Sequence, residues 1–336
     1  MNTTQIPFEY LSLFDGVPER RAVTLREVQQ AADVIYASSC LEPSRERMEA
    51  LNIMKAAFDR LEPDAYRSFC ARGCAIPPRE LDAIYEECPA LWWYDDSFRK
   101  ALHEMLYAKV AAGQVVLWHV YNMGYVVRTS TANFALDLHH RLSEDMVKYL
   151  SFAGITHNHP DHYTPQFAQA MNGAHKLLLT NFCTNDGYAG VGDEAGYFKG
   201  PARTIKVGDI TIRTFETDHN QKLRRFVQPI EIRCGEDGDA CVILTSGDTC
   251  DASQLRDCAE SPDFFIVHPY VGLDVAEAAR ILHPKMTLVG HLQEFHHPVS
   301  AARWTWRQGY EAASRIWGEG CDAVVPVWGE RIEFRR

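Results

Sequence analysis

The sequence lacks the features of an exported or membrane-anchored chain. No stretch stays apolar for the roughly 18 residues that a membrane-spanning helix needs. Residues 1–7 carry neither the positive charge nor the apolar segment of a signal peptide. We therefore expect a cytoplasmic protein that does not enter a membrane.

Positive charge is also scarce. The chain has 34 Lys and Arg against 45 Asp and Glu, a formal net charge of −11. Nucleic-acid surfaces depend on clustered Lys and Arg, so we expect no nucleic-acid partner, although a local basic patch stays open. The expected partner is a small-molecule substrate, and a homo-oligomer is also open.

The ten cysteines form no recognisable metal or disulfide framework. They are scattered through 336 residues, and no two are arranged as Cys-x-x-Cys. We expect most of them to be buried thiols. A bound metal would have to be held by other residue types.

Histidine, by contrast, is concentrated in one stretch. Residues 156–162 read Thr-His-Asn-His-Pro-Asp-His, which places three imidazoles and a carboxylate within six residues. Imidazole nitrogen and carboxylate oxygen together suit zinc and its first-row neighbours. His157 and His159 alternate at the end of an expected strand and would project to one side, whereas Asp161 and His162 would turn toward a second ion. The run predicts a metal site; the alternative is a surface loop that is rich in histidine by accident.

Two patterns divide the chain into residues 1–111 and 112–336. The first part predicts a helical region, with a capping box at Thr24 and Glu27, a further helix opening at Pro77-Pro78, and apolar residues at helical spacing. From Val115 onward, β-rich runs alternate with helices, and residues 323–334 are expected to close the sheet. The helical region could cap a pocket or form a subunit contact.

Beyond residue 112, expected strands repeatedly end in a residue that can bind metal. These residues are Asp137, His219, Asp248, His268 and His291. Two of them have competitors nearby. Asp218 competes with His219, and His296 and His297 compete with His291, which we favour because it directly ends its strand.

This order of residues resembles the metallo-β-lactamase fold, a four-layer αββα sandwich, over about residues 113–336. The resemblance implies one metal held by His157, His159 and His219, and a second held by Asp161, His162 and His291. It implies that Asp248 bridges the two ions. Asp137 would accept a hydrogen bond from a ligand imidazole without touching metal. The resemblance also favours His219 over Asp218.

Within that family, the C-terminal half is similar to a branch of metal-dependent hydrolases that includes ascorbate-phosphate lactonases. The shared features are Gly247-Asp248-Thr249, the helical stretch at residues 276–279, Pro284-Lys285, Gly290-His291 and the closing Val-Pro-Val-Trp-Gly-Glu at residues 325–330. The helical region at residues 1–111 lies outside this resemblance.

The resemblance implies a dinuclear hydrolase whose metal-bridging hydroxide attacks a small-molecule lactone, ester or phosphoester. Zinc is the expected metal, with manganese and iron open, and Asp161 would orient the hydroxide or handle its proton. The candidate substrate contacts are Tyr163, His268, His296 and His297. The alternatives are a nuclease or phosphodiesterase of the tRNA-processing type, oxygen chemistry at iron held by the same ligands, and a non-catalytic binding protein that keeps the ions for structure.

Overall fold

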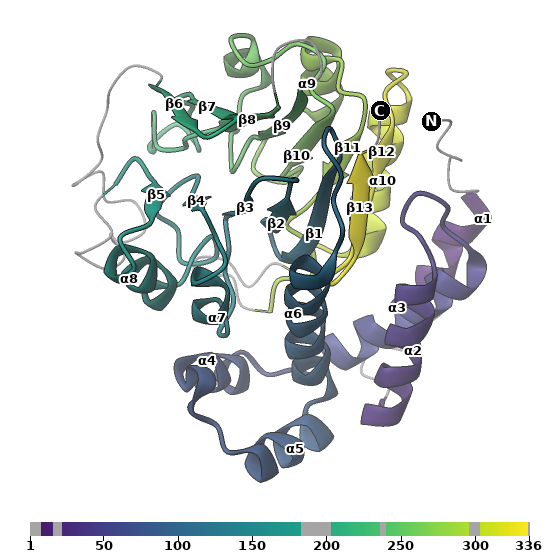
Figure 1. Ribbon diagram of the computed structural model, residues 1–336. Helices are drawn as coiled ribbons and strands as arrows, with labels where there is room; N and C mark the ends of the chain where they lie inside the picture. Colours follow the sequence, from purple (N-terminus) through teal and green to yellow (C-terminus); the bar gives the residue numbers. More distant parts are fainter. Residues whose placement is uncertain (1–7, 16–21, 183–202, 236–239, 296–302, 335–336) are drawn as a thin grey trace.

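Two β-sheets face each other and carry helices on their outer faces (Figure 1). The computed structural model describes residues 8–15, 22–182, 203–235, 240–295 and 303–334. Within these residues one sheet has six strands in the order β13-β1-β2-β3-β4-β5, and the other has seven in the order β12-β11-β10-β9-β8-β7-β6. The four-layer αββα arrangement expected from the sequence is confirmed.

Each sheet is mixed. In the six-stranded sheet only β3, β4 and β5 run parallel, and in the seven-stranded sheet β9 to β12 run parallel. The first sheet contains β1 (Val115–Tyr121), β2 (Gly124–Arg128), β3 (Asn133–Leu136), β4 (Phe152–Gly154), β5 (Leu177–Leu179) and β13 (Arg331–Phe334). The second contains β6 (Arg203–Val207), β7 (Ile210–Thr214), β8 (Ile230–Cys234), β9 (Cys241–Thr245), β10 (Phe264–Val267), β11 (Thr287–Val289) and β12 (Ala323–Val324).

The period-two alternation of the strands separates two apolar layers. In β1, Val115 and Leu117 belong to the core between the two sheets, whereas Val116 and Trp118 belong to the core under the helices. Successive side chains of a strand point to opposite faces, so a strand that is apolar at every position is buried on both. The continuous apolar runs of the sequence arise from this double burial.

The N-terminal helices pack beside the first sheet. They are α1 (Phe8–Leu11), α2 (Leu25–Ala37), α3 (Arg45–Phe58), α4 (Pro63–Ala71), α5 (Pro78–Glu87) and α6 (Pro89–Tyr107), with the short 3-10 turns η1 (Ser12–Asp15) and η2 (Gly73–Ala75). The predicted capping box at Thr24 and Glu27 is present at the start of α2. Helix α6 lies against β1 and β2, and α2, α3 and α5 pack against α6. The sequence did not predict α4, which has no side-chain cap.

Four further helices complete the outer layers. Helices α7 (Glu144–Val147) and α8 (Pro165–Gly173) lie on the side of the first sheet, and α9 (Val275–Leu282) and α10 (Trp306–Trp317) lie on the side of the second (Figure 1). A 3-10 turn, η4 (Ala252–Leu255), packs against α9. Helix α10 begins at a capping box of Thr305 and Gln308. Among the described residues, no helix is long and apolar enough to cross a membrane.

Two sequence predictions about strands are wrong. Residues 323–334 do not form one closing strand, because Gly329, with φ of +81°, turns the chain between β12 and β13, which belong to different sheets. The β-rich run at residues 227–232 also predicts a strand that starts at Val227, but β8 begins at Ile230. Val227 pairs with Thr217 only in an isolated bridge. Pro229, which lies between Val227 and Ile230, has no N–H to continue the ladder.

An aromatic cluster joins the N-terminal helices to the C-terminal half of the chain. The ring of Phe58 in α3 lies within 5.6 Å, centroid to centroid, of four others, those of Trp93, Phe295, Trp306 and Trp328. Arg47 of α3 forms a buried bidentate ion pair with Glu330, at 2.6 and 2.7 Å. Phe295, four residues after His291, is therefore packed directly against the N-terminal helices.

His140, in the loop after β3, is expected to make stability fall in mild acid. Its ring stacks on Tyr94 and Phe98, its Nε2–H donates to the Tyr94 carbonyl at 3.0 Å, and its Nδ1 accepts from the Leu142 N–H at 3.1 Å. Burial holds the pKa of His140 well below its ordinary value, and a proton on Nδ1 would oppose the Leu142 donor. The unfolded chain takes up that proton near pH 6.5.

The free energy of unfolding should therefore fall as the pH drops below about 6.5, by up to about 1.4 kcal/mol per pH unit from this one group. Urea unfolding at pH 7.5 and at pH 5.5, with the same chelator present, measures how much stability the wild-type protein and His140→Gln each lose on acidification. The variant lacks this titration and should lose less stability on acidification. An identical loss in both proteins would contradict the assignment.

Candidate metal centre

The candidate metal residues follow strand ends at one edge of the sandwich. Strand β4 runs into the histidine run at residues 156–162, β9 runs into Asp248, β10 into His268 and β11 into His291. Because the carboxyl ends of parallel strands meet at one edge of a sheet, residues far apart in the sequence gather there.

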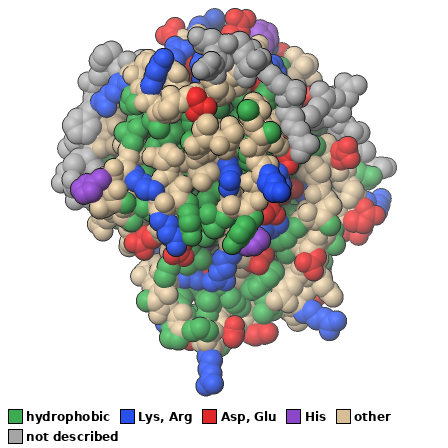
Figure 2. Space-filling view, viewed as in Figure 1, with side chains coloured by type: hydrophobic (Ala, Val, Ile, Leu, Met, Phe, Trp, Pro, Cys, Tyr) green, Lys and Arg blue, Asp and Glu red, His purple; other side chains and the backbone are tan. Residues whose placement is uncertain are grey.

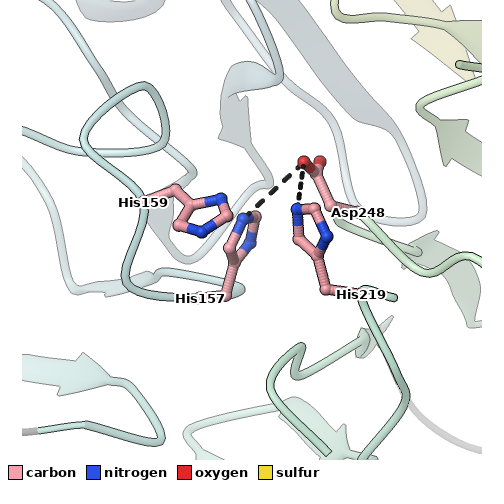
Figure 3. A group of neighbouring side chains, drawn as sticks. All are labelled: His157, His159, His219 and Asp248. Atoms are coloured by element: carbon pink, nitrogen blue, oxygen red, sulfur yellow. Dashed lines mark ion pairs between the residues drawn. The ribbon is translucent and has the colours of Figure 1, made fainter. Parts of the chain in front are cut away.

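His157, His159, His219 and Asp248 form the first group of possible ligands (Figure 3). The Nε2 atoms of His157 and His219 lie 3.7 and 3.4 Å from Oδ2 of Asp248. His159 packs edge-on against both of these histidines. Phe226 lies against all three rings and closes one side of the group.

Asp161, His162 and His291 form the second group. Oδ2 of Asp161 lies 2.9 Å from Nε2 of His291 and 3.5 Å from Nε2 of His162. All three residues are buried. The run at residues 156–162 thus divides its side chains between the two groups.

Asp248 faces both groups with different oxygens. Its Oδ2 faces His157 and His219, whereas its Oδ1 lies 3.2 Å from Nε2 of His162. A single carboxylate can donate one oxygen to each of two ions. Asp248 is therefore placed to join the two groups.

The distances between these atoms fit shared coordination of metal ions. Two ligands bound tetrahedrally at about 2.1 Å from one ion lie about 3.4 Å apart, and the separations above range from 2.9 to 3.7 Å. Nε2 of His157, His159 and His162 and Oδ1 of Asp161 are buried without a hydrogen-bond partner among the described residues. Unsatisfied buried atoms of this kind are costly unless a cation occupies the space between them.

The charge of the site also fits cations. In the part of the chain that the structure describes, the ion pairs of Asp137, Asp161 and Asp248 are all to histidine and none is to Lys or Arg. Burial lowers the pKa of His157 well below its ordinary value and that of His159 to about 4. Both rings are therefore neutral at pH 7 and offer lone pairs. Burial opposes charge on His162, but Asp248, Asp161 and Asp137 hold its pKa well above the ordinary value, so the carboxylates favour a cation between them.

Asp137 and Thr156 orient His162. Asp137 accepts hydrogen bonds from the Thr156 N–H at 2.7 Å, from the Thr156 hydroxyl at 2.8 Å and from Nδ1 of His162 at 3.1 Å. A proton on Nδ1 leaves Nε2 of His162 as the lone pair that faces Asp161 and Asp248. A carboxylate behind a ligand imidazole commonly sets its tautomer in this way.

Gly247 allows the chain to bring Asp248 close to the histidine run. Its φ is +51°, and a Cβ at this position would lie 2.6 Å from Cβ of Thr156. Any other residue would have to push the two segments apart. The glycine before Asp248 is thus a requirement of the close approach.

Three other residues at the site hold left-handed backbone conformations that are unusual for them. Asn122, Asp137 and His291 have φ values of +55°, +42° and +58°. Such strain is kept only where the surroundings enforce it, and it clusters at functional sites. The His291 N–H donates to the Asn122 carbonyl at 3.1 Å, which ties two of these residues together.

The structure also places the alternative metal ligand Asp218 and two of the candidate substrate contacts, Tyr163 and His268. Asp218, the alternative to His219, accepts hydrogen bonds from the Arg225 N–H at 2.8 Å and from Gln254 at 3.1 Å. Tyr163 is buried, and its hydroxyl donates to Asn158. Asp248, His268 and His291 form a third group of possible ligands, which shares Asp248 with the first group and His291 with the second. His296 and His297 lie outside the described residues, so their contact with substrate remains a prediction.

Sequence reasoning missed two residues at the site. Asn122, read only as part of a turn, donates from Nδ2 to the Asp161 carbonyl at 3.0 Å and lies 3.3 Å from Nε2 of His291. Glu294 is buried, and its Oε2 lies 3.9 Å from Nδ1 of His291. Only the spacing of Glu294, three residues after His291, could have suggested its place.

Comparison with solved structures finds several metal-dependent enzymes of similar arrangement. Igni18, a metallo hydrolase from the archaeon Ignicoccus hospitalis, shares 17% identity over 66% of this chain and 99% of its own, with a TM-score of 0.48. The metallo-β-lactamase fold protein YhfI from Bacillus subtilis shares 14% over 66% and 99%, with a TM-score of 0.46. CmlA, a diiron β-hydroxylase from Streptomyces venezuelae, shares 15% over 68% and 55%, with a TM-score of 0.47.

No protein-family model matches the sequence, and no curated protein matches it. At these identities and TM-scores, the solved structures say nothing about the activity or substrate of this chain. The αββα arrangement stands on the chain's own sheets and helices. The function has to be argued from the site.

Proposed function

We propose that the protein is a metal-dependent hydrolase that uses two divalent ions. The observation that carries this proposal is the position of Asp248, whose two oxygens face two separate groups of histidine and aspartate ligands, all buried except the half-buried His219. His157, His159 and His219 would hold one ion, Asp161, His162 and His291 would hold the other, and Asp248 faces both groups. A purely structural site needs only one closed set of about four ligands.

Bound divalent ions would supply a water whose pKa is lowered toward about 7 and would polarise the oxygen of the bond to be cleaved. Asp161 contributes an acceptor at Oδ1, which is buried without a partner among the described residues. Burial raises the pKa of Asp161, but His162 and His291 outweigh burial and hold that pKa well below its usual range. Asp161 therefore stays ionised and orients the attacking water by accepting its hydrogen bond.

Zinc is the proposed metal, because five of the seven ligands are imidazoles and the others are carboxylates. We place lactones and phosphoesters first among substrates, since the motifs from Gly247 to Glu330 resemble the branch that includes ascorbate-phosphate lactonases. A small molecule is favoured over a nucleic acid. On the face in Figure 2, Lys and Arg side chains lie among Asp and Glu and form no continuous basic surface.

Removal of metal tests the proposal. Protein purified without chelator should carry close to two ions per chain by elemental analysis, and should hydrolyse at least one member of a panel of lactones, phosphomonoesters and phosphodiesters. Chelation should abolish turnover, and added Zn²⁺ should restore it. Each expectation follows from a water that becomes nucleophilic at neutral pH only when it is bound to metal.

A matched pair of histidine variants supplies the control. His159→Ala should bind less metal and lose activity, whereas His103→Ala, which changes an exposed histidine on α6, should leave both unchanged. Purified protein without metal, or a His159→Ala variant as active as the wild type, would refute the proposal.

A further inference from the structure

His268 is a buried histidine that the proposed ligand set does not use. It follows β10, only 2% of its surface is exposed, and its Nδ1 lies 3.1 Å from Oδ1 of Asp248. At this distance an Nδ1–H of His268 can donate to Asp248, because a carboxylate only accepts. The acceptor is the same Asp248 oxygen that faces His162 in the second group.

The ring of His268 also stacks on His291. The two ring centroids are 3.6 Å apart, and the ring planes differ by only 6°. The lone pair of an imidazole nitrogen lies in the plane of its ring, so two parallel stacked rings cannot both direct lone pairs at one ion. If His291 binds the second ion, His268 in this arrangement does not bind it.

We propose that His268 is a positioning residue that holds Asp248 between the two ion positions. A carboxylate oxygen has two lone pairs, so Oδ1 can accept the hydrogen bond from His268 with one and bind an ion with the other. This hydrogen bond prevents the carboxylate from rotating so that both oxygens face His157 and His219. The stacked ring also keeps His291 in its orientation. The inference rests on the proposed function, because it requires ions at both groups.

Two substitutions separate the hydrogen bond from the ring. In His268→Asn, Nδ2 of the amide occupies the position of Nδ1 and can still donate to Asp248. In His268→Phe, the flat ring remains but the donor is lost. If His268 acts by donating to Asp248, the Asn variant should bind metal within a few-fold of the wild type. The Phe variant should bind the second ion about 10- to 100-fold more weakly, the usual effect of removing a hydrogen-bond partner of a metal ligand.

Metal binding and ligand geometry are the measurements. Zn²⁺ titration followed by elemental analysis gives the affinity for each ion, and the visible absorption of the Co²⁺-substituted protein reports the number and type of ligands. The Co²⁺ spectrum of the Asn variant should match that of the wild type. Thermal unfolding of the metal-free variants checks that each folds. The Asn variant decides the question even if the Phe variant does not fold.

Three outcomes overturn the inference. They are a Phe variant that binds both ions as tightly as the wild type, an Asn variant that binds as weakly as Phe, and a Co²⁺ spectrum of the Asn variant that reports a lost ligand. The last two would make His268 a direct ligand. The wild-type titration separates an error about His268 from an error about the proposed function. If the proposed function is wrong, the wild-type protein itself does not bind two ions.

Discussion

Asp248→Asn is expected to abolish hydrolysis, with kcat/KM falling on the order of a thousandfold or more. The carboxylate of Asp248 faces His157 and His219 with one oxygen and His162 with the other. An amide offers one oxygen and no charge, so at most one ion position keeps an oxygen ligand and the shared contact between the two groups is lost. Steady-state kinetics and metal content per chain measure the two consequences together.

Asp218→Asn is the matched control for this variant. Asp218 precedes His219 and is also a carboxylate at the end of a strand segment, but its oxygens bond to Arg225 and Gln254 away from the ligand groups. Its substitution should change activity by only a few-fold. An Asp248→Asn protein that keeps two ions and its turnover, or an equal loss in both variants, would contradict the role of Asp248.

Arg47→Met is expected to destabilise the fold by about 3–5 kcal/mol. Arg47 is fully buried and pairs with Glu330, which is only 5% exposed and also accepts the Val327 N–H at 2.7 Å. Loss of the guanidinium leaves a buried carboxylate without its cation. Urea unfolding at pH 7 measures the change in the free energy of unfolding.

An exposed bidentate pair provides the comparison. Arg72 and Glu80 make the same two-point contact at the surface, with side chains 37% and 48% exposed. Solvent screens such a pair, so Arg72→Met should cost less than about 1 kcal/mol. Equal effects of the two substitutions would mean that burial does not set the strength of the Arg47 pair.

Only some of the helices and strands could be predicted from the sequence. The capping box at Thr24 and Glu27 identifies α2 because such a signal acts within one turn of helix, whereas the capping box of α10 was found only in the structure. Helix α4 opens at a proline without a side-chain cap, as α5 does, but it was missed because its apolar residues Tyr66, Phe69 and Cys70 span little more than one helical turn. The sequence also did not predict that the chain crosses from one sheet to the other between β12 and β13. A run of β-forming residues does not reveal which sheet each strand joins.

At the site, local sequence was informative about the types of ligand. A run with three imidazoles and one carboxylate has few uses other than metal binding, and a strand that ends in Asp or His places that residue at a sheet edge. The roles of Asn122 and Glu294 were not visible. Neither belongs to a motif. Asn122 reaches the site only because the fold brings Asp161 and His291 beside it, and the burial of Glu294 next to His291 is likewise set by the packing around them.

The sequence by itself determined the chemistry of the ligands, the order in which they occur and the strands that carry them, since these depend on neighbouring residues. Only the tertiary structure decided which oxygen of Asp248 faces which histidine, that His268 stacks on His291, and that Arg47 meets Glu330 across 283 positions. These contacts join segments from different elements and both sheets. Their geometry is set by how the layers pack, and spacing along the chain carries no information about it.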